Sequence, residues 1–73
     1  MKEFTVCYTL DNKIITEKVI EELDVKKEDV EKIIIDRMER HKFFNVQNDK
    51  GNYIINSYLV RYVRITNEKI LVK

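Results

Sequence analysis

The sequence predicts a small α+β domain in which one main helix packs on one face of a small antiparallel sheet. Three observations point to this fold class: an alternating apolar and polar segment near the start, one long amphipathic segment in the middle, and short apolar runs separated by turn residues afterwards. We expect a single domain over residues 1–73, because 44% of the residues are hydrophobic and no linker or repeat divides the chain. The predicted sheet consists of two hairpins plus a C-terminal strand pair.

The first hairpin is predicted by an alternating strand followed by turn chemistry. The apolar positions of this strand are Phe4, Val6, Tyr8 and Leu10. Such alternation buries one face of a strand. The Asp-Asn pair at residues 11–12 favours a turn, so we expect residues 13–20 to return as the second arm. Apolar residues also recur at four-residue spacing here, which leaves a short helix over residues 16–24 as the alternative; we favour the hairpin.

The main helix is predicted over residues 27–41, where apolar residues recur at spacings of three and four. Its acidic Glu28 and Asp29 lie in the first turn and its basic Arg37 and Arg40 in the last, so both ends complement the helix dipole. The apolar stripe consists of Val30, Ile33, Ile34, Met38 and His41, widened by Ile35.

The second hairpin is centred on residues 48–52, which contain Gly51, the single glycine of the chain. An Asn-Asp-Lys-Gly-Asn run is a strong turn signal because glycine adopts backbone conformations that other residues avoid. Residues 43–48 and 53–55 are therefore predicted to form the two arms.

The C-terminal strand pair is predicted from a strand at residues 60–65, a turn over residues 66–69 and a short strand at residues 70–72. Alternation places Tyr62 and Arg64 on the same face of the first of these strands. If the apolar residues on its other face pack on the helix, this tyrosine and arginine lie on an open face of the sheet. A solvated face with no partner is the simpler explanation of the same pattern.

Charge is unevenly distributed along the chain and predicts a polarised molecule. Residues 1–36 contain six Lys/Arg and ten Asp/Glu, whereas residues 37–73 contain eight and three. All four arginines and five of the seven aromatic residues lie in the second half. This combination indicates an anionic partner such as nucleic acid, because arginine contacts phosphate bidentately and aromatic faces stack on bases. The candidate nucleic-acid-binding residues are Arg40, Lys42, Tyr58, Arg61, Tyr62 and Arg64.

The chain offers few groups for catalysis. A nucleophilic enzyme needs a nucleophile, a base and an orienting group. Cys7 and His41 are the only residues of their kinds; a packing role fits the cysteine and a helix-end role fits the histidine. The acidic pairs at residues 21–22 and 28–29 fit solvated or helix-start positions, and no spacing of metal ligands or glycine-rich loop is present. We expect no enzymatic activity, metal or cofactor.

Composition also bears on origin and location. The ten lysines, ten isoleucines and six asparagines have AT-rich codons, which favours an AT-rich genome and, with the small size, a phage or mobile-element gene. The first residues show no signal-peptide pattern and no apolar run approaches the roughly 18–20 residues of a membrane span. We expect a soluble cytoplasmic protein. A chain this short without a disulfide also favours self-association, and we expect a homodimer.

Residues 30–65 combine a helix, Phe44, a strand, the run Tyr53-Ile54-Ile55-Asn56 and then Val60 and Val63. This order resembles the C-terminal part of LytTR-type DNA-binding domains of bacterial regulators. The resemblance covers about half of the chain and implies DNA binding, without assigning a base contact to any one residue.

These observations lead to one main hypothesis and one alternative. The main hypothesis is a small non-enzymatic regulatory or accessory protein whose basic second half contacts nucleic acid. The alternative is a protein–protein interaction module, for example a mobile-element inhibitor that binds a host protein. Salt separates the two, because phosphate contacts weaken steeply with ionic strength and an apolar protein interface does not.

Overall fold

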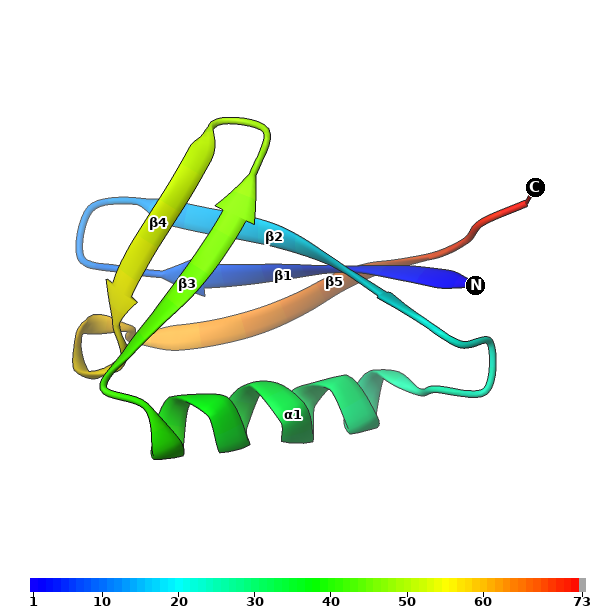
Figure 1. The fold of residues 1–73 in the computed structure, drawn as a ribbon, viewed down its shortest axis with the longest axis horizontal. Helices are drawn as coiled ribbons and strands as arrows, with labels where there is room; N and C mark the ends of the chain where they lie inside the picture. The colour runs from blue at the N-terminus through cyan, green and yellow to red at the C-terminus, as the bar shows by residue number, and fades with distance from the viewer. Residues whose placement is uncertain (73) are drawn as a thin grey trace.

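The computed structural model describes residues 1–72, apart from the side chain of Asn67, and confirms the α+β fold class (Figure 1). Within these residues there are five strands and one α-helix, which lies along one side of the molecule. The elements in chain order are β1 (Lys2–Thr9), β2 (Ile14–Glu21), α1 (Lys27–Arg40), β3 (Phe43–Asn48), β4 (Gly51–Asn56), the 3-10 turn η1 (Ser57–Leu59) and β5 (Tyr62–Ile70).

The strands form two antiparallel sheets where the sequence predicted one. The first sheet has the order β2-β1-β5, and β3 and β4 form a separate hairpin. The central strand β1 pairs along its whole length on both sides, so that Val6 lies between Glu17 of β2 and Ile65 of β5. The hairpin is linked to the first sheet where the Asn48 side-chain amide donates to the Thr16 carbonyl at 2.8 Å.

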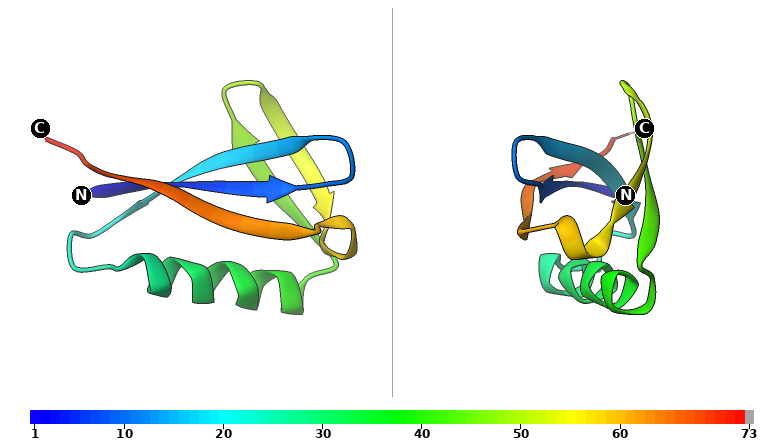
Figure 2. Two further views of the ribbon diagram at one scale, coloured as in Figure 1. Left: turned by 180° about the vertical axis from the view of Figure 1, so that it is seen from behind. Right: turned by 90° about the vertical axis from the view of Figure 1, so that its left-hand side faces the viewer.

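The helix and the β3-β4 hairpin lie on the same side of the three-stranded sheet, and the other side of this sheet is uncovered (Figure 2). Burial follows this arrangement. Phe4, Val6 and Tyr8 of β1 are fully buried, whereas Thr5 and Cys7 between them are only half-buried. The core is completed by residues of the surrounding elements: Ile15, Val30, Ile34, Phe44, Val46 and Ile55.

The second arm of the first hairpin is a strand, as favoured from the sequence. All eight residues of β2 pair with β1, and the turn is closed by the Leu10 amide, which donates to the Lys13 carbonyl at 2.9 Å. β-branched isoleucine, threonine and valine dominate this segment and favour a strand over a helix.

The predicted C-terminal strand pair is wrong, because residues 62–70 form one strand. Thr5 of β1 pairs with Thr66 and the preceding Phe4 pairs with Glu68, so Asn67 is the extra residue of a β-bulge and not part of a turn. The bulge lets β5 continue along β1 as far as the Lys2–Ile70 pair. A turn at residues 66–69 would have left the beginning of β1 unpaired on this side.

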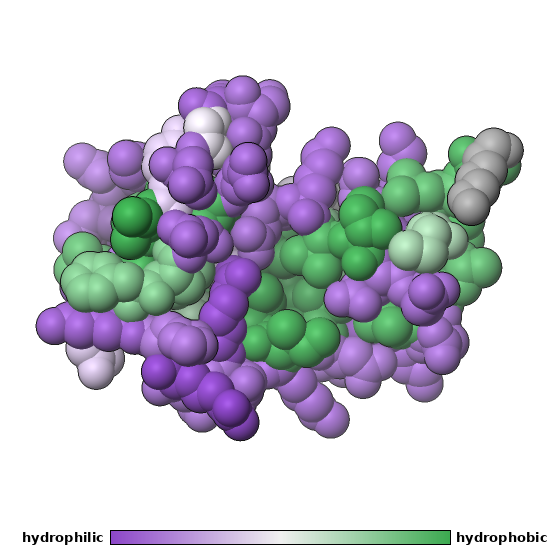
Figure 3. All heavy atoms as spheres, in the orientation of Figure 1, coloured by the Kyte–Doolittle hydropathy of each residue, from purple (hydrophilic) through white to green (hydrophobic). Residues whose placement is uncertain are grey.

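The hairpin covers only part of the inner face of the first sheet. In Figure 3, hydrophobic side chains are visible between β2 and α1, toward the chain termini, whereas the tip of the hairpin is hydrophilic. Leu23 and Ile33 are among the large apolar residues that remain about half exposed, at 54% and 53%.

The turn between β3 and β4 depends on Gly51, whose φ of +143° is one that other residues rarely adopt. We expect Gly51→Ala to lower the free energy of unfolding by about 1–2 kcal/mol through backbone strain. A steric clash is not the cause, because an added Cβ would meet no atom within 4 Å. Urea unfolding measures the change. The neighbouring Asn52→Ala serves as control and should stay within about 0.5 kcal/mol of the original chain; equal losses in both variants would contradict the role of φ.

Candidate nucleic-acid interface

The acidic first half and the basic second half of the chain lie against each other in the fold. Three ion pairs cross between them: Arg37 with Glu17 at 2.9 Å, Arg61 with Asp11 at 2.7 Å, and Lys2 with Glu68 at 2.7 Å. The charge segregation along the sequence is therefore partly cancelled in space. The prediction of a polarised molecule is corrected by this pairing, since the strands of the second half fold back on those of the first.

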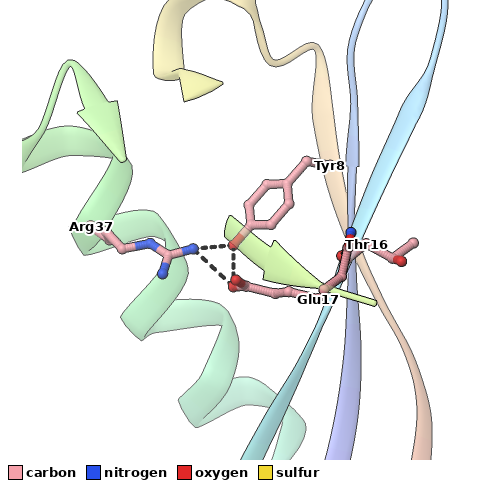
Figure 4. A network of polar contacts seen from close by, with 5 residues as sticks. Tyr8, Thr16, Glu17 and Arg37 are labelled. Atoms are coloured by element: carbon pink, nitrogen blue, oxygen red, sulfur yellow. Dashed lines mark hydrogen bonds and ion pairs between the residues drawn. The ribbon is translucent and has the colours of Figure 1, made fainter. Parts of the chain in front are cut away.

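The Arg37 side chain is partly buried, with 30% of it exposed, and it makes several polar contacts (Figure 4). Its Nη2 donates to Glu17 Oε1 at 2.9 Å and to the hydroxyl of Tyr8, which in turn donates to the same carboxylate oxygen at 2.7 Å. The guanidinium also lies 4.7 Å from the ring centroid of Phe44. The sequence assigned Arg37 only to the helix dipole, but its side chain is partly buried and is hydrogen-bonded to Glu17 and Tyr8.

The Tyr8 hydroxyl is held in its neutral form. Burial raises the pKa of this hydroxyl far above its ordinary value, and the hydrogen bond to Glu17 and the charge of that carboxylate raise it further, while the Arg37 charge lowers it in part. Tyr8 therefore remains a hydrogen-bond donor to Glu17 at neutral pH.

Four of the predicted site residues lie at one end of the molecule, where α1 ends, β3 begins and η1 packs beside the β1-β2 turn (left in Figure 1). These residues are Arg40, Lys42, Tyr58 and Arg61. Backbone hydrogen bonds assemble this end: the Ser57 amide donates to the Lys42 carbonyl at 2.7 Å, and the Arg61 amide donates to the Thr9 carbonyl at 2.8 Å.

The cations at this end already have local partners. Arg40 pairs with Asp36 at 2.9 Å and Arg61 with Asp11 at 2.7 Å, both on exposed side chains. Lys42 Nζ lies 5.7 Å from the ring centroid of Phe43, and Tyr58 is 80% exposed. Exposed ion pairs contribute little stability, about 0–1 kcal/mol, so these arginines remain able to exchange a carboxylate for another anion.

Tyr62 and Arg64 lie on the uncovered face of β5, as predicted from alternation. Val63 and Ile65 between them pack toward the core. Tyr62 pairs with Thr9 and Arg64 with Cys7 on β1, so both large side chains stand beside short neighbours. Tyr62 is 54% exposed, and no carboxylate within residues 1–72 forms an ion pair with Arg64. We call the uncovered side of the β2-β1-β5 sheet the open face.

The open face includes a cation that sequence reasoning did not assign to the site. Lys18 of β2 is exposed, pairs in register with Thr5, and its Nζ is 3.7 Å from a carboxylate oxygen of Glu3. Alternation along β2 places Lys18 on the side opposite the buried Ile15 and Glu17, and this was the signal that could have identified it.

Cys7 and His41 lie on different elements and are not arranged as a reactive pair. Cys7 is half-buried on the open face with its Sγ 3.8 Å from Thr66 Oγ1. His41 follows the last residue of α1 and is exposed, so its place on the predicted apolar stripe does not bury it. In the part of the chain that the structure describes, no three His, Cys, Asp or Glu side chains gather as a metal site. The described helix is too short and too polar to cross a membrane.

Comparison with protein-family models, with curated proteins and with solved structures finds no match to this chain. The resemblance of residues 30–65 to LytTR-type domains therefore stays a prediction.

The buried Tyr8 hydroxyl should make the fold sensitive to alkaline pH. Its folded-state pKa is raised above the ordinary value of about 10, so at higher pH the unfolded chain loses this proton while the folded chain keeps it. The contribution is fully present below pH ~10 and is lost as pH rises, by up to about 1.4 kcal/mol per pH unit. Urea unfolding at about pH 9, 10 and 11 measures this slope.

Tyr8→Phe has no hydroxyl to titrate and should lack this part of the slope, whereas the control Tyr58→Phe, at a side chain that is 80% exposed, should retain it. The same pH dependence in Tyr8→Phe and in the original chain would show that the buried proton is not the cause.

Proposed function

We propose that this chain is a small non-enzymatic regulatory or accessory protein that binds single-stranded nucleic acid on its open face. The observation that supports this proposal is the position of Tyr62 and Arg64, which are exposed side by side on one face of β5 beside the short residues Thr9 and Cys7. An aromatic ring that is free on an open sheet can stack on a base, and a guanidinium near it can contact the adjoining phosphate.

Single strands fit this face better than a duplex. Bases in a duplex are stacked on each other and their faces are hidden, whereas an unpaired base offers its face to a ring such as that of Tyr62. Lys18 and Lys69, both exposed on the flanking strands, extend the positive charge across the sheet. Arg61 and Arg40 can add contacts where the strand leaves the sheet, by releasing Asp11 and Asp36.

Self-association, a cytoplasmic location and a phage or mobile-element origin belong to the same proposal. The apolar area between β2 and α1 in Figure 3 offers a surface for a second copy, and Leu23 and Ile33 are also half exposed.

Two substitutions on the open face should have different signatures. Arg64→Ala removes one phosphate contact, so affinity should fall and the slope of log affinity against log salt should decrease by about 0.7–1. Tyr62→Ala removes stacking, so affinity should fall by about 1–3 kcal/mol with the salt slope nearly unchanged. Fluorescence anisotropy with labelled single-stranded and duplex oligonucleotides at several salt concentrations measures both quantities.

Lys32→Ala is the matched control, because Lys32 is an exposed cation on α1, across the sheet from the open face. It should change affinity and salt slope much less than Arg64→Ala. Absence of binding even at about 20–50 mM salt, where phosphate attraction is strongest, would rule out the proposed function.

A further inference from the structure

We infer that the free edge of β5 binds an extended segment of a partner protein, in which apolar and acidic residues alternate, as a fourth strand of the sheet. This inference goes beyond the proposed function, because it concerns the edge of β5 and an apolar hollow between β5 and α1. The nucleic-acid proposal concerns the open face.

The first observation is that β5 is an edge strand. The sheet order is β2-β1-β5, so β1 is the hydrogen-bonded neighbour of β5 within the described residues. The other edge of β5 therefore presents backbone N–H and C=O groups that an added strand can pair. The bulge at Asn67 interrupts the register, which leaves residues 62–66 as the regular stretch for such pairing.

The second observation is an apolar hollow of about 230 Å³ between this edge and the helix. Its apolar lining residues are Ile34, Ile35, Met38, Val60, Val63 and Ile65. Glu31, Arg61 and Tyr62 also line it, so Tyr62 borders both the hollow and the open face. Val63 and Ile65 are the inward-facing residues of β5, so a strand added beside them would direct every second side chain toward the hollow. Ile35 of α1 lines the hollow and is still 55% exposed, which leaves apolar surface for those side chains to cover.

The charged side chains of β5 determine which kind of partner strand fits beside it. Arg64 and Lys69 of β5 are exposed cations. Glu68 is paired with Lys2 at 2.7 Å, and the adjoining Arg61 is paired with Asp11 at 2.7 Å. Side chains of an added strand that point to the open face would lie beside Arg64, where a carboxylate is favoured. A second copy of β5 fits poorly, because antiparallel pairing centred on Arg64 would place two arginines side by side. The occupant is thus a partner segment with apolar residues inward and acidic residues outward.

The test uses a labelled eight-residue peptide that alternates valine and glutamate, and the matching peptide that alternates valine and lysine. We expect the glutamate peptide to bind the intact protein in fluorescence anisotropy and the lysine peptide not to bind. In amide exchange by NMR, the glutamate peptide should slow exchange of β5 amides within residues 62–66, because edge groups gain partners.

Ile35→Gln should weaken binding of the glutamate peptide about tenfold, since it places an amide at the hollow. Ile33→Gln is the matched control: Ile33 is on the same helix and is equally exposed, at 53%, but does not line the hollow, so affinity should be unchanged. Both variants should keep the oligonucleotide affinity of the original chain, because neither residue lies on the open face.

Three results would overturn this inference: no binding of the glutamate peptide, equal binding of the lysine peptide, or equal affinity of Ile35→Gln and Ile33→Gln. Failure of oligonucleotide binding would reject the proposed function and leave the peptide result standing, so the two proposals fail separately.

Discussion

The contact among Arg37, Glu17 and Tyr8 holds the helix α1 on the β2-β1-β5 sheet. It joins the last turn of α1 to β2 and β1, and the guanidinium also packs on the ring of Phe44 in β3. Burying a charge is unfavourable unless it is paired and hydrogen-bonded, so each member of this contact depends on the other two. The hydrogen bonding of the Arg37 guanidinium is incomplete, because its Nε is buried and has no hydrogen-bond partner among the described residues. We therefore expect the contact to fix the position of the helix on the sheet more than it adds net stability.

Sequence patterns predicted the elements whose signals are local. Alternation in β1, the helix α1 and the turn at Gly51 each depend on neighbouring residues, and these elements are confirmed. The helical stripe is confirmed only in part, because Val30 and Ile34 are buried while Ile33, Ile35 and His41 are exposed. The end of β5 was missed because Asn67 has turn chemistry, whereas its place in a bulge is set by pairing with β1, which is distant in sequence. Arg37 was missed for a similar reason: its partner Glu17 is 20 residues away. One signal was present, since alternation in β2 places Glu17 on the same side as the buried Ile15.

The candidate site was predicted in part. Tyr62 and Arg64 share an uncovered face, as alternation required, because a strand fixes which side chains lie together. The distribution of charge in space could not be predicted from its distribution along the chain, because pairing of Arg61 with Asp11 depends on β5 lying against β1. The two proposed binding surfaces meet at β5: the open face with Arg64 lies on one side of this strand, and the apolar hollow against α1 lies on the other.

A double-mutant cycle on Glu17 and Arg37 tests most directly whether their contact organises the fold. Glu17→Gln, Arg37→Met and the double variant would be compared with the original chain by urea unfolding at neutral pH. We predict that each single variant is destabilised, that the double variant loses less than the sum, and that the coupling free energy exceeds about 1 kcal/mol. Losses that add to within about 0.3 kcal/mol would contradict this account, because they would show that the two side chains stabilise the fold independently.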